Sequence, residues 1–197
     1  SLMQNKQFSA ANAILKQSTI LPNEGATEGR RLYKETNLML ALEQMEKKKY
    51  KKALEYIAAS RLWPENLGVG KPYDEEIDDR LENWLAYESY TKTGNTKLAR
   101  KMLDNILAFP LYDPETGRPV YSVNNLITAW AMKKTGKANE ALTLLEDRVH
   151  NNPNNELAKW VLNAYNGEFG NLAGIRSRRG DEDQRILNSL LHSGWRP

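Results

Sequence analysis

The stretch KTGNTKLARKML, residues 92–103, decides the fold, because the stretch KTGKANEALTLL, residues 134–145, repeats its pattern. In both, a glycine stands five residues before an alanine, and two apolar residues follow three and four positions after that alanine. An alanine with apolar residues at these spacings forms one buried stripe of an α-helix. The glycine suits the left-handed residue of a tight turn. The stretch therefore predicts a turn followed by a half-buried helix.

The same register occurs four times along the 197-residue chain. The alanines are separated by 42, 46 and 42 residues, and a proline follows each of them after eleven or twelve positions. Proline ends a helix because it lacks an amide hydrogen and its ring clashes with the preceding turn. The aligned positions are Ala11, Ala53, Ala99 and Ala141, with the prolines Pro22, Pro64, Pro110 and Pro153.

A further helix is predicted upstream of each of the last three alanines, over residues 25–48, 80–92 and 123–134. Sixteen residues before each of these alanines stands an asparagine: Asn37, Asn83 and Asn125. In the first two units, Lys6 and Lys48 take the place of the turn glycine. The sequence therefore predicts an all-α chain, in which each unit consists of a helix, a short turn, an alanine-bearing helix and a closing proline.

This pattern resembles the tetratricopeptide repeat, in which a small residue, a turn glycine, a second-helix alanine and a closing proline fall at these spacings. The matching positions are Ala41, Ala53, Gly94, Ala99, Ala129, Gly136, Ala141 and Pro153, while Tyr87 fills the small position of the middle unit. The repeats are longer than the standard one of roughly 34 residues. The resemblance implies a right-handed α-solenoid of about four helical hairpins.

We expect a single domain over residues 1–197, with units near 1–22, 25–64, 80–110, 123–153 and 154–197. The last unit departs from the register at NGEFGNLAGIRSRRG, residues 166–180, and is interpreted as an irregular C-terminal cap. The first unit has only its second helix. The chain therefore begins inside a repeat, which is expected of a fragment of a longer array.

The extra length lies after the closing prolines, in the connections Pro22–Gly29, Pro64–Asp79 and Pro110–Ser122. In a stacked array such connections leave along one edge, so we expect these three loops to lie side by side and to form a loop edge. Two segments resemble the C-terminal repeat region of large bacterial proteins: ILPNEGATEGRRLY (20–33) and SRLWPENLGVGKPYDEEIDDR (60–80). Those proteins carry an uncharacterised β-rich domain that is similar to carbohydrate-active enzymes.

The glycines of Gly68-Val69-Gly70-Lys71 do not form a phosphate-binding loop. That loop needs a glycine five residues before the Gly-Lys pair and a serine or threonine after the lysine. Glu65 and Pro72 occupy those positions. The stretch is interpreted as a long connection between two helices.

No catalytic group, cofactor or metal is expected. The chain has no cysteine, and its two histidines, His150 and His192, stand far apart. The acidic run Asp74–Asp79 lacks the alternating ligands and central glycine of a calcium loop, and it is interpreted as the start of a helix. A pair of loop-edge carboxylates remains an open alternative for acid–base catalysis; the candidates are Glu24, Glu28, Glu65, Asp113 and Glu115.

The charge pattern argues against a nucleic-acid partner. The net charge is only +3, and the basic residues are scattered rather than gathered in a stripe. No apolar run approaches the roughly 20 residues that span a bilayer, so no membrane insertion is expected. The compartment is left open between cytoplasm and periplasm, because neither the charge nor the lack of cysteines decides it.

The resemblance implies a non-catalytic module that binds a protein, a peptide or an adjacent domain. First helices of such arrays line a concave groove, so the candidate binding residues there are Trp84, Trp130, Trp160, Asn37, Asn83 and Asn125. Lys71 and Tyr73 are the candidates on the loop edge. The alternatives are that the tryptophans fill the core, that the asparagines brace neighbouring helices, and that Lys71 and Tyr73 brace loops. An accessory role beside a carbohydrate-active site and self-association also remain open.

Overall fold

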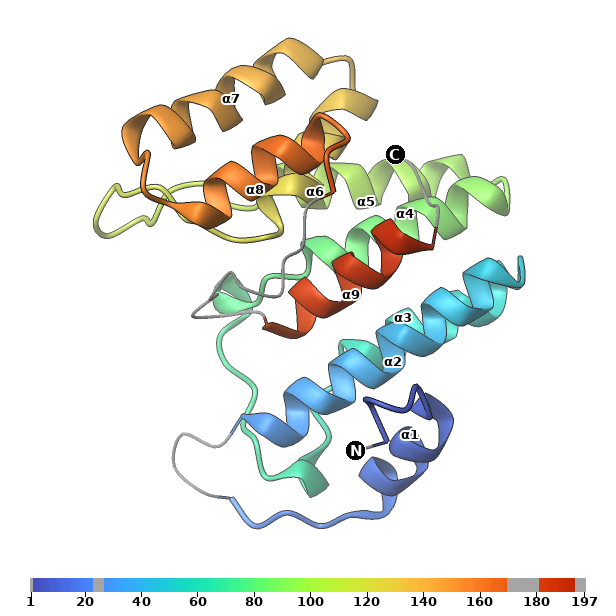
Figure 1. The fold of residues 1–197 in the computed structure, drawn as a ribbon. Helices are drawn as coiled ribbons and strands as arrows, with labels where there is room; N and C mark the ends of the chain where they lie inside the picture. The colour runs from blue at the N-terminus through green and yellow to red at the C-terminus, as the bar shows by residue number, and fades with distance from the viewer. Residues whose placement is uncertain (1, 23–26, 170–180, 194–197) are drawn as a thin grey trace. The chain divides into compact units, whose positions relative to one another are not determined.

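Figure 1 shows the computed structural model of the chain, which describes residues 2–22, 27–169 and 181–193. Within these ranges the regular structure is helical, apart from an isolated β-bridge between Tyr112 and Pro119. The prediction of an all-α chain is therefore confirmed. The chain forms two compact units, Ser1–Ala99 (unit 1) and Arg100–Pro197 (unit 2), and the boundary falls inside helix α5 (Thr96–Ala108).

Unit 1 contains four α-helices before α5. The first packs against the second, the second against the third, and the third against the fourth. They are α1 (Phe8–Gln17), α2 (Glu28–Glu46), α3 (Tyr50–Ser60) and α4 (Arg80–Lys92), with short 3-10 turns η1 (Glu65–Leu67) and η2 (Asp74–Glu76) between α3 and α4. The predicted helix over 80–92 matches α4. The helix predicted over 25–48 corresponds to α2, which is shorter than predicted at both ends. Leu38, Ile57 and Leu85 belong to the core of this unit.

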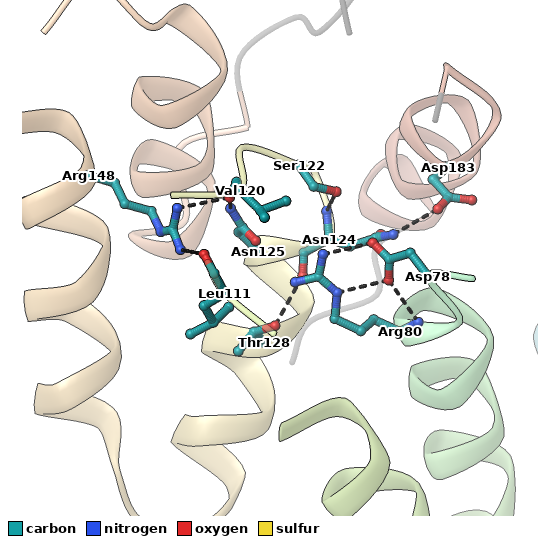
Figure 2. Close-up of polar contacts among 10 residues, drawn as sticks. All are labelled: Asp78, Arg80, Leu111, Val120, Ser122, Asn124, Asn125, Thr128, Arg148 and Asp183. Atoms are coloured by element: carbon teal, nitrogen blue, oxygen red, sulfur yellow. Dashed lines mark hydrogen bonds and ion pairs between the residues drawn. The ribbon is translucent and has the colours of Figure 1, made fainter. Parts of the chain in front are cut away.

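Unit 2 contains α6 (Asn125–Lys134), α7 (Ala138–Asn151), α8 (Glu156–Tyr165) and α9 (Asp181–His192). Helices α6, α7 and α8 pack against one another in all three pairs. Asn124, directly before α6, donates a hydrogen bond of 2.7 Å from Nδ2 to Oδ2 of Asp183 in α9 (Figure 2). The apolar face of α9 is buried.

Each predicted turn centres on a left-handed residue. Lys6, Lys48, Gly94 and Gly136 have φ angles of 55°, 56°, 76° and 83°. At each turn this residue donates its N–H to the carbonyl three positions back, and the next residue donates to the carbonyl five positions before itself. For Gly94 and its successor Asn95 these bonds measure 3.2 and 2.9 Å. The pair of bonds is the Schellman motif, which satisfies carbonyls at a helix end and reverses the chain.

A further copy of the same motif follows α8. Gly167 has a φ of 90°, and its N–H and that of Glu168 make the equivalent bonds of 3.1 and 2.8 Å. The repeat register did not predict this turn, because leucine, not alanine, stands five residues after the glycine. The turn register therefore extends one unit further than predicted.

The repeat alanines lie in the interior, as the register requires. Ala11, Ala53, Ala99 and Ala141 are all buried, and so are the first-helix small residues Ala41 and Ala129. A methyl group at these positions lets two helices approach closely. The burial confirms the prediction for the alanines, whereas the apolar pair of the first unit departs from it, because Ile14 is 54% exposed.

Replacing Lys48 with glycine should stabilise the protein by about 1 kcal/mol, because a left-handed conformation costs a residue with a Cβ roughly that much and costs glycine little. The free energy of unfolding in urea measures the gain. Lys48→Ala is the matched control, since it removes the same charge but keeps the strained Cβ. An equal gain in both variants would attribute the effect to the charge of the neighbouring lysines and contradict the backbone explanation.

Candidate interaction surface

Asn66, in the second long connection, is bonded to the end of α1 and to the segment that follows it in unit 1. Its Nδ2 donates to the carbonyl of Leu15 (3.0 Å), in the last turn of α1, and to that of Ser18 (2.7 Å), directly after α1. Its own carbonyl accepts the N–H of Ile20 at 2.7 Å. The second loop is therefore bonded to the segment that precedes the first loop, and the side-by-side arrangement of the two predicted loops stays a prediction. The third loop belongs to unit 2, so its place beside the other two stays a prediction.

Gly68 allows the second loop to approach the segment after α1 closely. Its φ is 66°, and a Cβ at this position would stand 2.6 Å from the carbonyl oxygen of Ile20. Leu67 beside it is buried. The glycine and the apolar anchor together let the loop pack its backbone directly against the neighbouring segment. A leucine followed by glycine inside a polar loop is the sequence signal that was available for this contact.

A pocket of about 400 Å³, the Trp63 pocket, opens beside Asn66 in unit 1. It is bounded by the end of α1, by α2 and by the chain that follows α3; the lining residues are Leu15, Lys16, Tyr33, Leu62, Trp63, Pro64 and Asn66. This volume falls within the roughly 300–1,000 Å³ of ordinary ligand pockets. A second hollow, next to Arg148 in unit 2, holds about 10 Å³. That is room for about one water molecule, so the Trp63 pocket is the better candidate.

Contacts within unit 1 hold the aromatic wall of the Trp63 pocket in place. The guanidinium carbon of Arg30 lies 4.5 Å from the centre of the Trp63 ring, a cation–π contact. Arg30 is itself buried and donates from Nη2 to the carbonyl of Ser60 at 2.7 Å. Leu62, by contrast, is 57% exposed. The pocket therefore combines a fixed aromatic side chain with an exposed aliphatic one.

The predicted exposure of the tryptophans on a concave groove is wrong, because Trp84, Trp130 and Trp160 are all buried. Seven consecutive residues of α4, Arg80–Ala86, and seven of α6, Asn125–Ala131, are buried. Helices covered on nearly all sides leave no open face for a large ring, and aromatic burial is strongly favourable. The tryptophans belong to the core, which is the alternative that the sequence also allowed.

The three aligned asparagines are buried and bind neighbouring parts of the chain. Each one links the first helix of its hairpin to the segment that precedes it. The bonds are Asn12 Nδ2 to Asn37 Oδ1 (3.1 Å), Arg61 Nη2 to Asn83 Oδ1 (2.9 Å) and Asn125 Nδ2 to the carbonyl of Val120 (2.8 Å). These contacts agree with the bracing alternative. The asparagines are therefore assigned to the interior rather than to a peptide-binding groove.

Lys71 and Tyr73 lie at the surface of unit 1. Lys71 forms an ion pair with Asp74, with 2.6 Å between Nζ and Oδ1, and both side chains are largely exposed. Tyr73 is 78% exposed. A partner can therefore reach the tyrosine ring directly, whereas Lys71 already has a carboxylate beside it. Their role in binding stays a prediction.

Arg148 holds the third loop in unit 2 and was not singled out by the sequence. Its guanidinium donates to the carbonyls of Leu111 and Val120, both at 2.8 Å (Figure 2). It also lies over the rings of Tyr112 and Tyr121, at 5.6 and 5.7 Å from their centres. One buried side chain thus closes both ends of the loop. No local pattern identifies such a residue, because its partners stand 28 and 37 positions away.

The carboxylates considered for acid–base work are placed as follows. Asp113 accepts hydrogen bonds from the backbone and hydroxyl of Thr116, which hold its pKa below the ordinary value. It is therefore an ionised turn residue, which is poorly suited to donating a proton. Glu28, Glu65 and Glu115 are exposed, and Glu24 lies outside the described residues. The described contacts do not join any two of these carboxylates.

A buried ion pair joins α2 and α4 in unit 1. Nζ of Lys34 lies 3.0 Å from Oε1 of Glu82, whose side chain is completely buried. Burial raises the pKa of Glu82, and Asp79 adds to this rise, while Lys34 acts in the opposite direction. Burial is the larger effect because a carboxylate loses more hydration free energy in the interior than one partly exposed lysine returns.

In the part of the chain that the structure describes, no group of three or more histidines and carboxylates is arranged to hold a metal ion. None of the described helices is long and apolar enough to cross a membrane. Comparison with known proteins gave no significant match to any family model, curated protein or solved structure.

Replacing Gly68 with alanine should lower the free energy of unfolding by about 2–4 kcal/mol, from the left-handed φ and the clash with the Ile20 carbonyl together. Gly70→Ala is the control, since a Cβ there would meet nothing within 4 Å. Urea denaturation of both variants tests the prediction. Equal stability of the two variants would mean that Gly68 does not pack against the Ile20 carbonyl as described.

Glu82 should make stability depend on pH above 4.5, the ordinary value of its carboxyl. Because the folded pKa is raised, its contribution is complete below 4.5 and is lost as pH rises through the folded pKa. The unfolding free energy of the native chain minus that of Glu82→Gln should therefore decrease over this range. Denaturation of both proteins across the pH range measures it. A difference that increases with pH would show that the attraction of Lys34 outweighs burial.

Proposed function

We propose that the chain is a non-catalytic interaction module built from tetratricopeptide-like hairpins, and that its binding surface is the Trp63 pocket of unit 1, where the second long loop begins. The observation that carries the proposal is the pocket of about 400 Å³, in which Leu62 is exposed beside the fixed ring of Trp63. Aromatic side chains held in a pocket are typical centres of binding energy at protein interfaces.

The repeated turns support the tetratricopeptide-like array within this proposal. The same Schellman motif recurs at Lys48, Gly94 and Gly136, each followed by a helix with a buried alanine. In unit 1 successive helices also pack in order. Stacked hairpins of this kind form a right-handed solenoid, and their connections leave along one edge. Two lining residues of the pocket, Pro64 and Asn66, belong to such a connection.

The walls of the pocket are preorganised for binding. Arg30 covers one part of the Trp63 ring, and Asn66 is held by three hydrogen bonds to the segment after α1. Side chains that are already ordered lose little entropy when a partner binds. When a partner buries an apolar group in the pocket, little of the favourable free energy is therefore lost to ordering the pocket walls.

The expected occupant is an apolar side chain of a partner protein. Burying one such side chain is worth about 1.5–3 kcal/mol, which gives only weak binding by itself. Leu21, 81% exposed and next to Ile20 on the segment that is bonded to Asn66, offers a second apolar contact along the loop edge. Tyr73 on the second loop offers another. An extended segment of a partner can contact several of these side chains.

Selection of peptides from a random display library against the chain should yield sequences with a recurring aliphatic or aromatic residue. Leu62→Asp should weaken their binding at least tenfold, because it places a charge in the apolar pocket. Tyr112→Asp is the matched control, since Tyr112 is 52% exposed but belongs to unit 2. Binding affinity measured by calorimetry decides the outcome. Selected peptides that bind Leu62→Asp as tightly as the native chain would contradict the proposal.

A further inference from the structure

We propose that the partner segment carries a carboxylate next to the apolar side chain that enters the Trp63 pocket, and that Lys16 recognises this carboxylate. The inference rests on the proposed function and adds the charge of the partner to it. Lys16 is the charged residue among those that line the pocket, and the rest of the lining is apolar, aromatic or amide. A single cation beside an apolar pocket favours an amphipathic ligand of opposite charge.

Lys16 lies at the pocket without a carboxylate of the described chain paired with it, as several other exposed lysines do elsewhere. The lysines of four other sites have an acidic residue three positions away: Lys52 with Glu55, Lys71 with Asp74, Lys137 with Glu140 and Lys159 with Glu156. Around Lys16, positions 12, 13, 19 and 20 are Asn, Ala, Thr and Ile. Among the described residues no carboxylate therefore occupies the ammonium group, and we infer that it accepts a carboxylate of the partner.

The end of α1 does not repel an anion as strongly as an uncapped helix end does. The C-terminal end of a helix carries a partial negative charge on its unbonded carbonyls. Here the carbonyl of Ile14 accepts from the N–H and hydroxyl of Ser18, at 2.9 and 2.8 Å. The carbonyls of Leu15 and Ser18 accept from Asn66. Three carbonyls near Lys16 are thus already bonded, which leaves its charge as the main electrostatic feature of the rim.

Glu65 is the acidic residue that opposes this preference. It stands between Pro64 and Asn66, both of which line the pocket, but it does not line the pocket itself and is exposed to solvent. Both charges are exposed and screened by water and salt, but Lys16 lines the pocket and Glu65 does not, so Lys16 is the charge that borders the pocket. The balance favours an acidic neighbour, and removal of the Glu65 charge should strengthen that preference.

The ligand is assigned to a peptide segment rather than to a free small carboxylate. Leu21 and Leu62, both strongly exposed, lie on segments that Asn66 joins or borders, so apolar surface continues beyond the pocket. A small carboxylate can fill the pocket and reach Lys16 but leaves these side chains in water. A peptide contacts all of them and buries more apolar area, which provides the larger free energy.

The test uses the full chain, labelled with nitrogen-15, and four acetylated and amidated peptides that are titrated by NMR. The probes are Gly-Phe-Glu-Gly, its neutral isostere Gly-Phe-Gln-Gly, the basic Gly-Phe-Lys-Gly and the anchorless Gly-Ala-Glu-Gly. The acidic phenylalanine peptide should bind about two- to fivefold more tightly than the neutral one, the usual size of an exposed charge pair. The difference should shrink at high salt. The anchorless peptide should bind most weakly.

Lys16→Glu should reverse the order, so that the basic phenylalanine peptide becomes the preferred one. Lys101→Glu makes the same charge change on α5 outside the pocket and should leave the order unchanged, while Glu65→Gln should widen the preference for the acidic peptide. The three phenylalanine peptides could bind the native chain equally and fail to bind Leu62→Asp. That result would overturn the inference and leave the proposed function intact. If no phenylalanine peptide perturbs the pocket signals, the proposed function itself is contradicted. Binding of 3-phenylpropionate as tight as that of the acidic peptide would also overturn the assignment to a peptide.

Discussion

The fold depends on a left-handed residue at the end of the first helix of each hairpin. Without it the helix would either continue or leave in a direction that separates its apolar face from the next helix. Glycine adopts this conformation at little cost at positions 94, 136 and 167, whereas Lys6 and Lys48 adopt it with a strained Cβ. The structure retains these lysines in that conformation because the two Schellman bonds and the buried alanine that follows fix the chain on both sides of the turn.

Once the hairpins are formed, polar side chains decide where the long connections lie. Carbonyls of a loop that packs against a helix lose water and need a donor. Asn66 supplies that donor in unit 1, and Arg148 supplies it in unit 2. Asn125 donates to a loop carbonyl in the same way, whereas Asn37 and Asn83 accept hydrogen bonds from the side chains of Asn12 and Arg61. The interior therefore contains a set of specific polar contacts, each of which accepts one arrangement of the neighbouring segments and excludes others.

This division of roles moves the candidate binding surface away from Trp84, Trp130 and Trp160. The large rings of the first helices are used to fill the interior, where their area contributes most to stability. The Trp63 pocket instead lies where two loops meet the end of α1, and there Arg30 and Asn66 fix the walls while Leu62 remains exposed. An exposed apolar pocket with ordered walls costs some solubility, and the proposed gain is a partner that binds without reorganising the loops.

The sequence by itself determined the all-α class, the positions of the turns and the burial of the repeat alanines. These features follow from local rules, because backbone conformation and helical periodicity depend on residues only a few positions apart. The tertiary structure alone decided the burial of Trp84, Trp130 and Trp160, the partners of the asparagines and the existence of the Trp63 pocket. Most of these depend on which distant segments meet, as Asn12 meets Asn37 across 25 residues of chain and Asn66 meets Leu15 across 51. The spacing of residue types shows that a side chain faces inward, but not which distant carbonyl or ring it will find there.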